Sequence, residues 1–324
     1  MNRRELLQGL SALGSGAAFL PARALESYPT KPIRVICGSA AGALLDVATR
    51  LYSEPMSRYL GQPLVVDNVA GASSLIAARM AAKAEPDGYT LLTAANTIVT
   101  IPHLSPKAGY GMRDFSAIGE MARAPSLMVT SSESKFRTVA DLVNEAKKTP
   151  GGLDYGSGGQ GTTSHLPAEL FIREAGVKIN HVPFKGVAPA VPDLVANRVA
   201  FMMVTPTSVS GLVKSGQLRV LAISSEARSP KFPDVPTFRE LGYGGATFEI
   251  WVGILAPAHM PEAIRARLGQ AMEAARADPR MAQKLEEMGE SMSNVRTPEQ
   301  FESTLRTEET KYAKLIKEAH IVAE

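Results

Sequence analysis

The segment from Gly156 to His165 carries the residues best suited to chemistry. It reads Gly-Ser-Gly-Gly-Gln-Gly-Thr-Thr-Ser-His and lies between a short apolar segment and a helical pattern. The spacing Gly-x-Gly-x-x-Gly is typical of a dinucleotide-binding turn, in which a pyrophosphate sits at a helix N-terminus. The same segment could hold a carboxylate, because glycines let backbone N–H groups turn inward and Thr162, Thr163 and Ser164 add neutral hydroxyl donors.

The next predicted strand distinguishes these two interpretations. A dinucleotide site needs an acidic residue about 20 residues further along, where it binds a ribose hydroxyl. The strand predicted there, residues 179–183, contains no Asp or Glu. The sequence therefore favours an anion-binding loop and no cofactor, and a merely flexible loop stays open as the third alternative. The candidate ligand-binding residues of this loop are Gly159, Gln160, Gly161, Thr162, Thr163 and His165.

Two further loops follow predicted strands and precede predicted helices. Residues 38–46 follow the apolar run 33–37, and residues 94–97 end the run that begins at Thr90. Ligands of doubly wound sheets bind beyond the carboxyl ends of the strands, which is where these loops would lie. Asp46 is expected to favour the positive end of the following helix. The candidate ligand-binding residues are Ser39, Ala40, Ala41, Gly42, Ala43, Asn96 and Thr97.

Signatures of hydrolases and metal sites are missing from the sequence. It contains neither Gly-x-Ser-x-Gly nor His-Glu-x-x-His, and its five histidines lack metal-ligand spacing. His165 could donate a hydrogen bond to a ligand or cap the local backbone. The single cysteine, Cys37, lies in an apolar run and is expected to be a small buried residue. We therefore expect no catalytic residue and no metal ligand.

The first 24 residues have the features of an export signal. Arg3 and Arg4 precede an apolar run over residues 6–20, and the pattern Ala22-Arg23-Ala24 follows as a cleavage site. The arginine pair favours the twin-arginine route, and the general secretory route stays open. The apolar run is too short to span a bilayer. The sequence therefore predicts an exported protein that is cleaved near Ala24 and located in the periplasm.

The charge of the chain gives no sign of a polyanionic partner. Removal of residues 1–24 lowers the number of basic residues from 35 to 32 and of acidic residues from 32 to 31, so the net charge falls from +3 to +1. No basic patch with interleaved aromatic residues occurs, which argues against nucleic acid as a partner. The capture of an anion would therefore depend on local geometry.

Apolar segments alternate with longer amphipathic ones, which indicates an α/β fold, and the length of the mature chain indicates two domains. The predicted strands are residues 33–37, 64–67, 90–94, 127–130, 153–156, 179–183, 199–204, 218–223 and 247–255. The predicted helices are residues 46–59, 74–83, 139–148, 164–175, 187–196, 206–215, 261–277, 279–288 and 298–319. The last three helices each begin with proline, which suits the first helical turn.

Motifs distributed over the whole mature chain carry a family resemblance. They lie at residues 28–34, 60–68, 86–92, 157–166, 181–186, 228–237 and 251–257. With these motifs the chain resembles the extracytoplasmic substrate-binding proteins of tripartite tricarboxylate transporters, the Bug family. The resemblance implies an α/β, two-domain periplasmic-binding-protein (flytrap) fold of type II with two crossing strands at the hinge. Domain 1 would comprise residues 28–127 and 252–324, and domain 2 would comprise residues 128–251.

The resemblance also implies a function. A small organic carboxylate would be held between the loops at residues 39–46 and 157–165, mainly by backbone N–H groups and waters. The protein would be a monomer that binds without turnover, and membrane subunits of the tripartite type would be its partners. A ligand sensor of the same fold is an alternative, because transport and sensing differ in the partner. An enzyme that uses residues 156–161 for a cofactor phosphate is the other alternative.

The chain departs from the family pattern at two places in the expected cleft. The first loop carries Leu44, Leu45 and several alanines where the family has a run of glycines. After the strand 199–203, Val204 stands where the family commonly has an Asp that can meet a ligand amino group. Val204 and its neighbour Thr205 complete the candidate site. Both departures make the cleft more apolar, so we expect an acid with an apolar or aromatic body.

The export signal can be tested directly. Mass spectrometry of periplasmic material should show a chain that begins after Ala24, because the small-residue pattern there fits a cleavage site. Replacement of Arg3 and Arg4 by lysine should block export if the twin-arginine route is used. A periplasmic chain with Met1 intact would contradict cleavage. Undiminished export of the lysine variant would leave the general secretory route.

Overall fold

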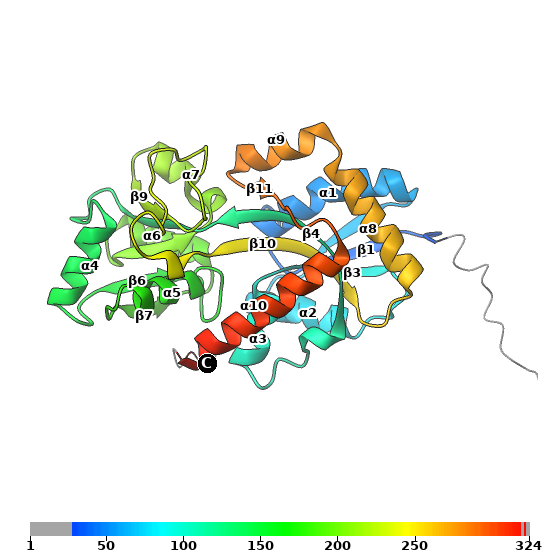
Figure 1. The fold of residues 1–324 in the computed structure, drawn as a ribbon, viewed down its shortest axis with the longest axis horizontal. Helices are drawn as coiled ribbons and strands as arrows, with labels where there is room; N and C mark the ends of the chain where they lie inside the picture. Colours follow the sequence, from blue (N-terminus) through cyan, green and yellow to red (C-terminus); the bar gives the residue numbers. More distant parts are fainter. Residues whose placement is uncertain (1–27, 319–320, 322–324) are drawn as a thin grey trace, which may run out of the picture.

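The structure is a computed structural model that describes residues 28–318 and 321. The predicted export signal, residues 1–24, lies outside the described residues. Figure 1 shows two α/β halves, one around a six-stranded sheet and one around a five-stranded sheet. The halves are joined by long strands that run between them. No helix within residues 28–318 is long and apolar enough to cross a membrane.

The first half is built on a mixed sheet. Its strands are β1 (Ile33–Cys37), β2 (Leu64–Asn68), β3 (Thr90–Ala95), β4 (Phe115–Pro125), β10 (Glu249–Pro257) and β11 (Ser291–Met292). They lie in the order β11-β4-β10-β3-β1-β2. β1 pairs in parallel with β2 and β3, whereas β10 runs antiparallel to β3 and β4. The carboxyl ends of β1, β2 and β3 therefore meet at one edge of the sheet.

The second half repeats this arrangement with fewer strands. They are β5 (Leu127–Ser131), β6 (Asp154–Ser157), β7 (Asn180–Pro183), β8 (Phe201–Val204) and β9 (Leu218–Ile223). They lie in the order β7-β6-β8-β5-β9. β6 is parallel to β7 and β8, and β5 is antiparallel to β8 and β9. The carboxyl ends of β6, β7 and β8 therefore also share one edge.

Helices cover the sheets and supply much of the core. They are α1 (Leu44–Leu60), α2 (Leu75–Ala82), α3 (Thr97–Leu104), α4 (Val139–Lys148), α5 (Leu166–Glu174), α6 (Val187–Val195), α7 (Pro206–Lys214), α8 (Glu262–Arg276), α9 (Pro279–Met288) and α10 (Pro298–Glu318). In α1, Ala48, Tyr52 and Met56 recur at a spacing of four residues, and all three are fully buried. α10 runs from the first half toward the second (Figure 1), where Glu318 accepts a 2.8 Å hydrogen bond from Arg173 of α5.

Two β-strands, β4 and β11, and one α-helix, α3, were not predicted from the sequence. In β4, Gly119, Glu120 and Arg123 interrupt the apolar pattern. Glu120 is fully buried, but its carboxylate lies 2.6 Å from Arg123 Nε and accepts a 2.8 Å hydrogen bond from Ser293. A charge paired in this way can be buried in a strand. The sequence pattern did not predict α3, because its β-branched residues and Pro102 disfavour helical backbone.

The chain crosses between the halves at two places that touch. Ser126 connects β4 to β5, and the segment from Ser224 to Phe248 connects β9 to β10. Ser224 Oγ accepts a 2.8 Å hydrogen bond from the Ser126 N–H and donates to the Phe248 carbonyl. Backbone hydrogen bonds of 2.9 and 3.0 Å join the same three residues. The chain therefore passes from one sheet to the other at this crossing. The domain ranges given above stay a prediction.

The halves also contact each other where α9 ends. Gly289 has a φ of +80°, and a Cβ there would lie 2.9 Å from Pro206 Cβ at the start of α7. Lys231, in the segment after β9, donates a 2.5 Å hydrogen bond to the Glu287 carbonyl. Glu290 follows with 5% of its surface exposed, and neither carboxylate oxygen has a hydrogen-bond partner among the described residues. Burial raises the pKa of Glu290 to about 8, although the charge of Lys231 opposes this shift.

Glu290→Gln should remove a pH dependence of stability. The carboxyl has a pKa of about 8 in the folded chain and 4.5 as its ordinary value. Its stabilising contribution is therefore present below pH 4.5 and is lost as the pH rises through 8, because the folded state must keep a proton that the unfolded state releases. Between these pH values, urea denaturation should show that the free energy of unfolding of the variant rises relative to that of the wild type by about 3 to 5 kcal/mol. A pH-independent difference would contradict this.

Candidate functional site

A cleft of about 1100 Å³ lies between the two halves, where the carboxyl ends of their parallel strands face each other. The first half contributes the loops after β1, β2 and β3. The second half contributes the loops after β6, β7 and β8. The lining residues are Ser39, Ala40, Gly42, Ala43, Leu44, Leu45, Gly71, Ala72, Ser73, Ser74, Ala95, Thr97, Gly158, Gly159, Thr162, Thr163, Ser164, Phe184, Lys185, Gly186, Val187, Ala188, Pro189, Met203, Val204, Thr205, Thr207, Ser208 and Ile250.

Five helices begin at the wall of this cleft. Leu44 of α1, Thr97 of α3 and Val187 of α6 are first helical residues, and the N-caps of α2 and α7 are Ser74 and Thr205. The N–H groups of Leu44 and Leu45 have no acceptor among the described residues. Each helix N-terminus carries partial positive charge and unpaired N–H groups. The wall therefore presents a positive potential without a cluster of basic side chains.

Charged side chains are almost absent from the wall. Lys185 is the one charged residue among the described residues that line the cleft. Asp46, next to the first loop, is 3% exposed, and its carboxylate accepts hydrogen bonds of 2.9 Å from the Gly42 N–H, Arg50 and Asn68. Burial acts to raise the pKa of Asp46, but these hydrogen bonds outweigh it and lower the pKa. Asp46 thus holds the first loop in place, as expected for a residue at the start of α1.

The glycine-rich loop, residues 156–165, supplies acceptors for most of its own backbone N–H groups. The N–H of Gly158 donates to Ser164 Oγ at 2.8 Å, and that of Gly159 to Ser157 Oγ at 3.0 Å. The N–H of Gly161 donates to His165 Nδ1 at 3.0 Å. These three N–H groups are therefore engaged within the loop, which leaves fewer for a carboxylate or a pyrophosphate than the sequence suggests.

His165 supports this loop from behind. It is 2% exposed, and its ring stacks on that of His181 with centroids 4.0 Å apart. Burial lowers the pKa of His165 to about 3 and that of His181 to about 4, so both rings are neutral at pH 7. His181 Nε2 lies 2.5 Å from Ser157 Oγ, and neither residue lines the cleft. Of the two roles considered for His165, the geometry fits capping of the local backbone.

The structure brings ten of the fifteen candidate residues together in the wall of the cleft. They are Ser39, Ala40, Gly42, Ala43, Thr97, Gly159, Thr162, Thr163, Val204 and Thr205. The remaining five, which do not line it, are Ala41, Asn96, Gln160, Gly161 and His165. Asn96 is fully buried and holds β10, because its side chain accepts from the Trp251 N–H and donates to Glu308. Gly161 packs directly against α3, because a Cβ added at this glycine would lie 1.9 Å from Leu104.

Two parts of the wall were not predicted from the sequence. Residues 71–74 follow β2, and Ala72, Ser73 and Ser74 all have positive φ values. Residues 184–189 follow β7 and lead into α6. The rule that ligands bind beyond the carboxyl ends of parallel strands, applied to the strands predicted at 64–67 and 179–183, would have found both.

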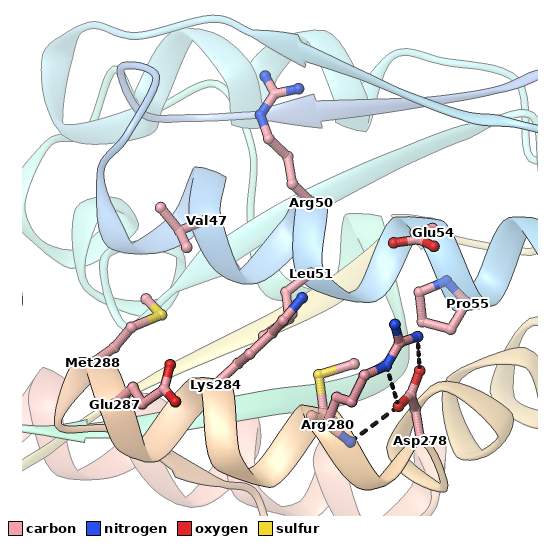
Figure 2. Close-up of a pocket in the computed structure, with 11 residues that line it drawn as sticks. Val47, Arg50, Leu51, Glu54, Pro55, Asp278, Arg280, Lys284, Glu287 and Met288 are labelled. Carbon is pink, nitrogen blue, oxygen red and sulfur yellow. Dashed lines mark hydrogen bonds and ion pairs between the residues drawn. The ribbon is translucent and has the colours of Figure 1, made fainter.

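A smaller groove of about 470 Å³ lies between α1 and α9 (Figure 2). Both arginines that line it are paired within the chain: Arg280 lies 2.7 Å from Asp278, and Arg50 lies 2.9 Å from Asp46. Helices of the first half alone form it, so closure of the two halves would not enclose a ligand there. The cleft between the halves is therefore the better candidate.

Comparisons with known proteins bear on the family and the fold of this chain. A family model described as the tripartite tricarboxylate transporter family receptor matches residues 48–321. A UPF0065 protein of Pseudomonas sp. (strain P51) is 33% identical over 100% of this chain and 96% of its own length. The protein BugT of Bordetella pertussis is 34% identical over 79% of this chain and 80% of its own length.

Solved structures give the same result. The periplasmic binding protein BugD has a TM-score of 0.81 and 29% identity, and the match covers 92% of this chain and 100% of BugD. A Rhodopseudomonas palustris protein, Rpa4515, solved with adipate, has a TM-score of 0.82 and 30% identity over 92% of this chain and 100% of its own. These matches confirm the predicted two-part α/β fold and the family resemblance. The chain belongs to the Bug family of tripartite tricarboxylate transporter receptors.

Proposed function

We propose that this protein is a periplasmic solute-binding protein that captures a small organic carboxylate in the cleft and does not turn it over. The observation that carries the proposal is the wall itself, in which five helices begin and no acidic side chain is present among the described lining residues. Helix N-termini bind anions through unpaired N–H groups and partial positive charge. Relatives solved with malate and with adipate support a carboxylate as the ligand class.

The carboxylate would be bound by neutral donors. In the first half these are the unpaired N–H groups at the start of α1 and the Thr97 hydroxyl. In the second half Thr163 supplies a hydroxyl that has no hydrogen-bond partner among the described residues, whereas Thr162 and Ser164 use theirs within the loop. Thr163 is therefore the residue of the glycine-rich loop best placed to donate to a ligand.

The body of the ligand would rest on apolar surface. Met203 and Val204 end β8, Phe184 follows β7, and Ile250 lies in β10 at the wall of the cleft. Burial of apolar area contributes about 25 cal/mol per Å². We therefore favour an acid with an aliphatic or aromatic body.

Capture would involve closure of the two halves. Residues 28–127 and 252–324 would move as one domain and residues 128–251 as the other, with the crossing at Ser126 and Ser224 as the hinge. Membrane subunits of the tripartite type would recognise the closed form, and the protein would act as a monomer after cleavage near Ala24. A same-fold sensor would differ only in its partner.

A thermal-shift panel tests this function. Organic acids should raise the melting temperature of the mature protein, because a ligand that binds only the folded state stabilises it. Nucleotides should not, since the N–H groups of Gly158, Gly159 and Gly161 are already engaged. Stabilisation by a dinucleotide instead would favour the cofactor-binding alternative.

Thr163→Val should then weaken the acid that the panel identifies. It removes a hydroxyl at nearly constant volume, and a hydrogen bond to a charged group is worth about 1.5 to 3 kcal/mol, or roughly 10- to 100-fold in Kd. Thr310→Val is the matched control, because Thr310 lies on α10 and bonds the Arg306 carbonyl. Equal affinity in wild type and Thr163→Val, measured by calorimetry, would show that the loop only supports the fold. A glycine variant is less suitable, since a Cβ at Gly161 would overlap Leu104.

Val204 should determine the preference against amino acids. It is 2% exposed at the end of β8 and leaves a ligand ammonium without a carboxylate partner. We expect the wild type to bind glutarate more tightly than glutamate. Val204→Asp should weaken glutarate by about ten-fold relative to Val204→Asn, which separates the charge from the change in polarity. Tighter binding of glutamate than glutarate by the wild type would overturn this prediction.

A further inference from the structure

The cleft contains one charge that nothing in its wall neutralises. Among its described lining residues Lys185 alone is charged, and its side chain is exposed. Lys185 takes part in no ion pair or hydrogen bond within the described part of the chain. Among the other described lysines of the second half, Lys135 and Lys231 have such partners, whereas Lys147, Lys148, Lys178 and Lys214 have none. Lys185 differs from these unpaired lysines because it alone lines the cleft.

Lys185 projects from a segment that is packed against the glycine-rich loop. It follows β7 and stands between Phe184 and Gly186, which also line the cleft. A Cβ on Gly159 would lie 3.3 Å from the Phe184 carbonyl oxygen, and one on Gly158 would lie 3.0 Å from the Val187 nitrogen. The two segments therefore form one continuous wall, and the base of the Lys185 side chain is fixed beside the loop that contains Thr163.

Closure of the cleft would change the hydration of the Lys185 ammonium group. When the halves approach, water leaves the cleft and an unpaired ammonium group loses hydration, which costs free energy unless an anion replaces the water. The first carboxylate of the ligand already has neutral donors at the start of α1 and at Thr163. A ligand ammonium would be repelled by Lys185 and would find no acidic partner at Val204. A second anionic group on the ligand would replace the water that the Lys185 ammonium group loses.

We propose that Lys185 binds a second anionic group of the ligand and so makes the protein selective for dianionic acids with an apolar body between their two charges. This rests on the proposed function and narrows its ligand class. An ion pair that forms at the mouth of a partly solvated cleft has an effective dielectric well below that of water, and so contributes on the order of ten-fold to affinity. The same pair should weaken as salt is added.

Matched ligand pairs test the role of Lys185. Adipate and hexanoate share a six-carbon chain, and terephthalate and benzoate share an aromatic ring, so each pair differs by one carboxylate. Calorimetry should show that the wild type prefers the diacid of at least one pair. Lys185→Met should weaken that diacid by about ten-fold and the monoacid by less than about two-fold. Lys185→Arg should keep the preference because it keeps the charge.

Lys178→Met is the control variant. Lys178 is exposed and precedes the same strand at its opposite end, away from the cleft, so its replacement should change neither affinity. The proposal is overturned if Lys185→Met leaves the ratio of diacid to monoacid affinity unchanged, whether both are weakened or neither is. Equal binding of both members of each pair by the wild type would overturn it as well and would leave the proposed function standing. Binding of neither member of any pair would count against the proposed function itself, and the inference would fall with it.

Discussion

The geometry of the cleft depends on the crossing of the chain at Ser224, where backbone hydrogen bonds and one buried hydroxyl join the two segments. The Ser224 hydroxyl accepts from the Ser126 N–H and donates to the Phe248 carbonyl, and so joins the two segments by which the chain passes between the sheets. All three residues are buried, with exposures of 0 to 2%. A buried backbone group without a partner costs about 1 to 3 kcal/mol. Because every loop of the cleft is attached to one sheet or the other, this crossing determines how the two walls face each other.

The sequence was informative at two places where a strand is followed by a small-residue loop and a helix, although the loop at residues 71–74 after β2, which has the same order, was missed. Residues 38–46 and 156–165 were predicted as loops of one site, and both line the same cleft. The hydrogen bonds inside the second loop could not be predicted, because they depend on side-chain rotamers. Ser157, Ser164 and His165 take up N–H groups that the glycine spacing alone seemed to offer to a ligand. A glycine-rich motif gives the shape of such a loop but not the number of its free donors.

The sequence failed where tertiary contacts override local pattern. β4 contains Glu120 and Arg123, and a strand that carries two charges is not expected at the centre of a fold. The structure buries Glu120 because Arg123 and Ser293 pair with it, and Ser293 lies far along the chain beyond β11. No pattern confined to residues 115–125 could reveal that partner. β4 was therefore hidden by the same ion pair that makes its burial possible.

The two halves meet outside the cleft through contacts too close for a side chain. Gly161 approaches Leu104 on one side, where the Thr100 hydroxyl donates to the Gly161 carbonyl at 3.3 Å, and Gly289 approaches Pro206 on another. With the halves in contact in this way, the helix N-termini of both halves lie around the same cleft. Backbone dipoles act more strongly as the local dielectric falls, and they need no counter-charge while the cleft is open to water. Apart from Lys185, the wall can therefore stay hydrated without a counter-ion when it is empty, and the proposed closure would make it more selective for anions.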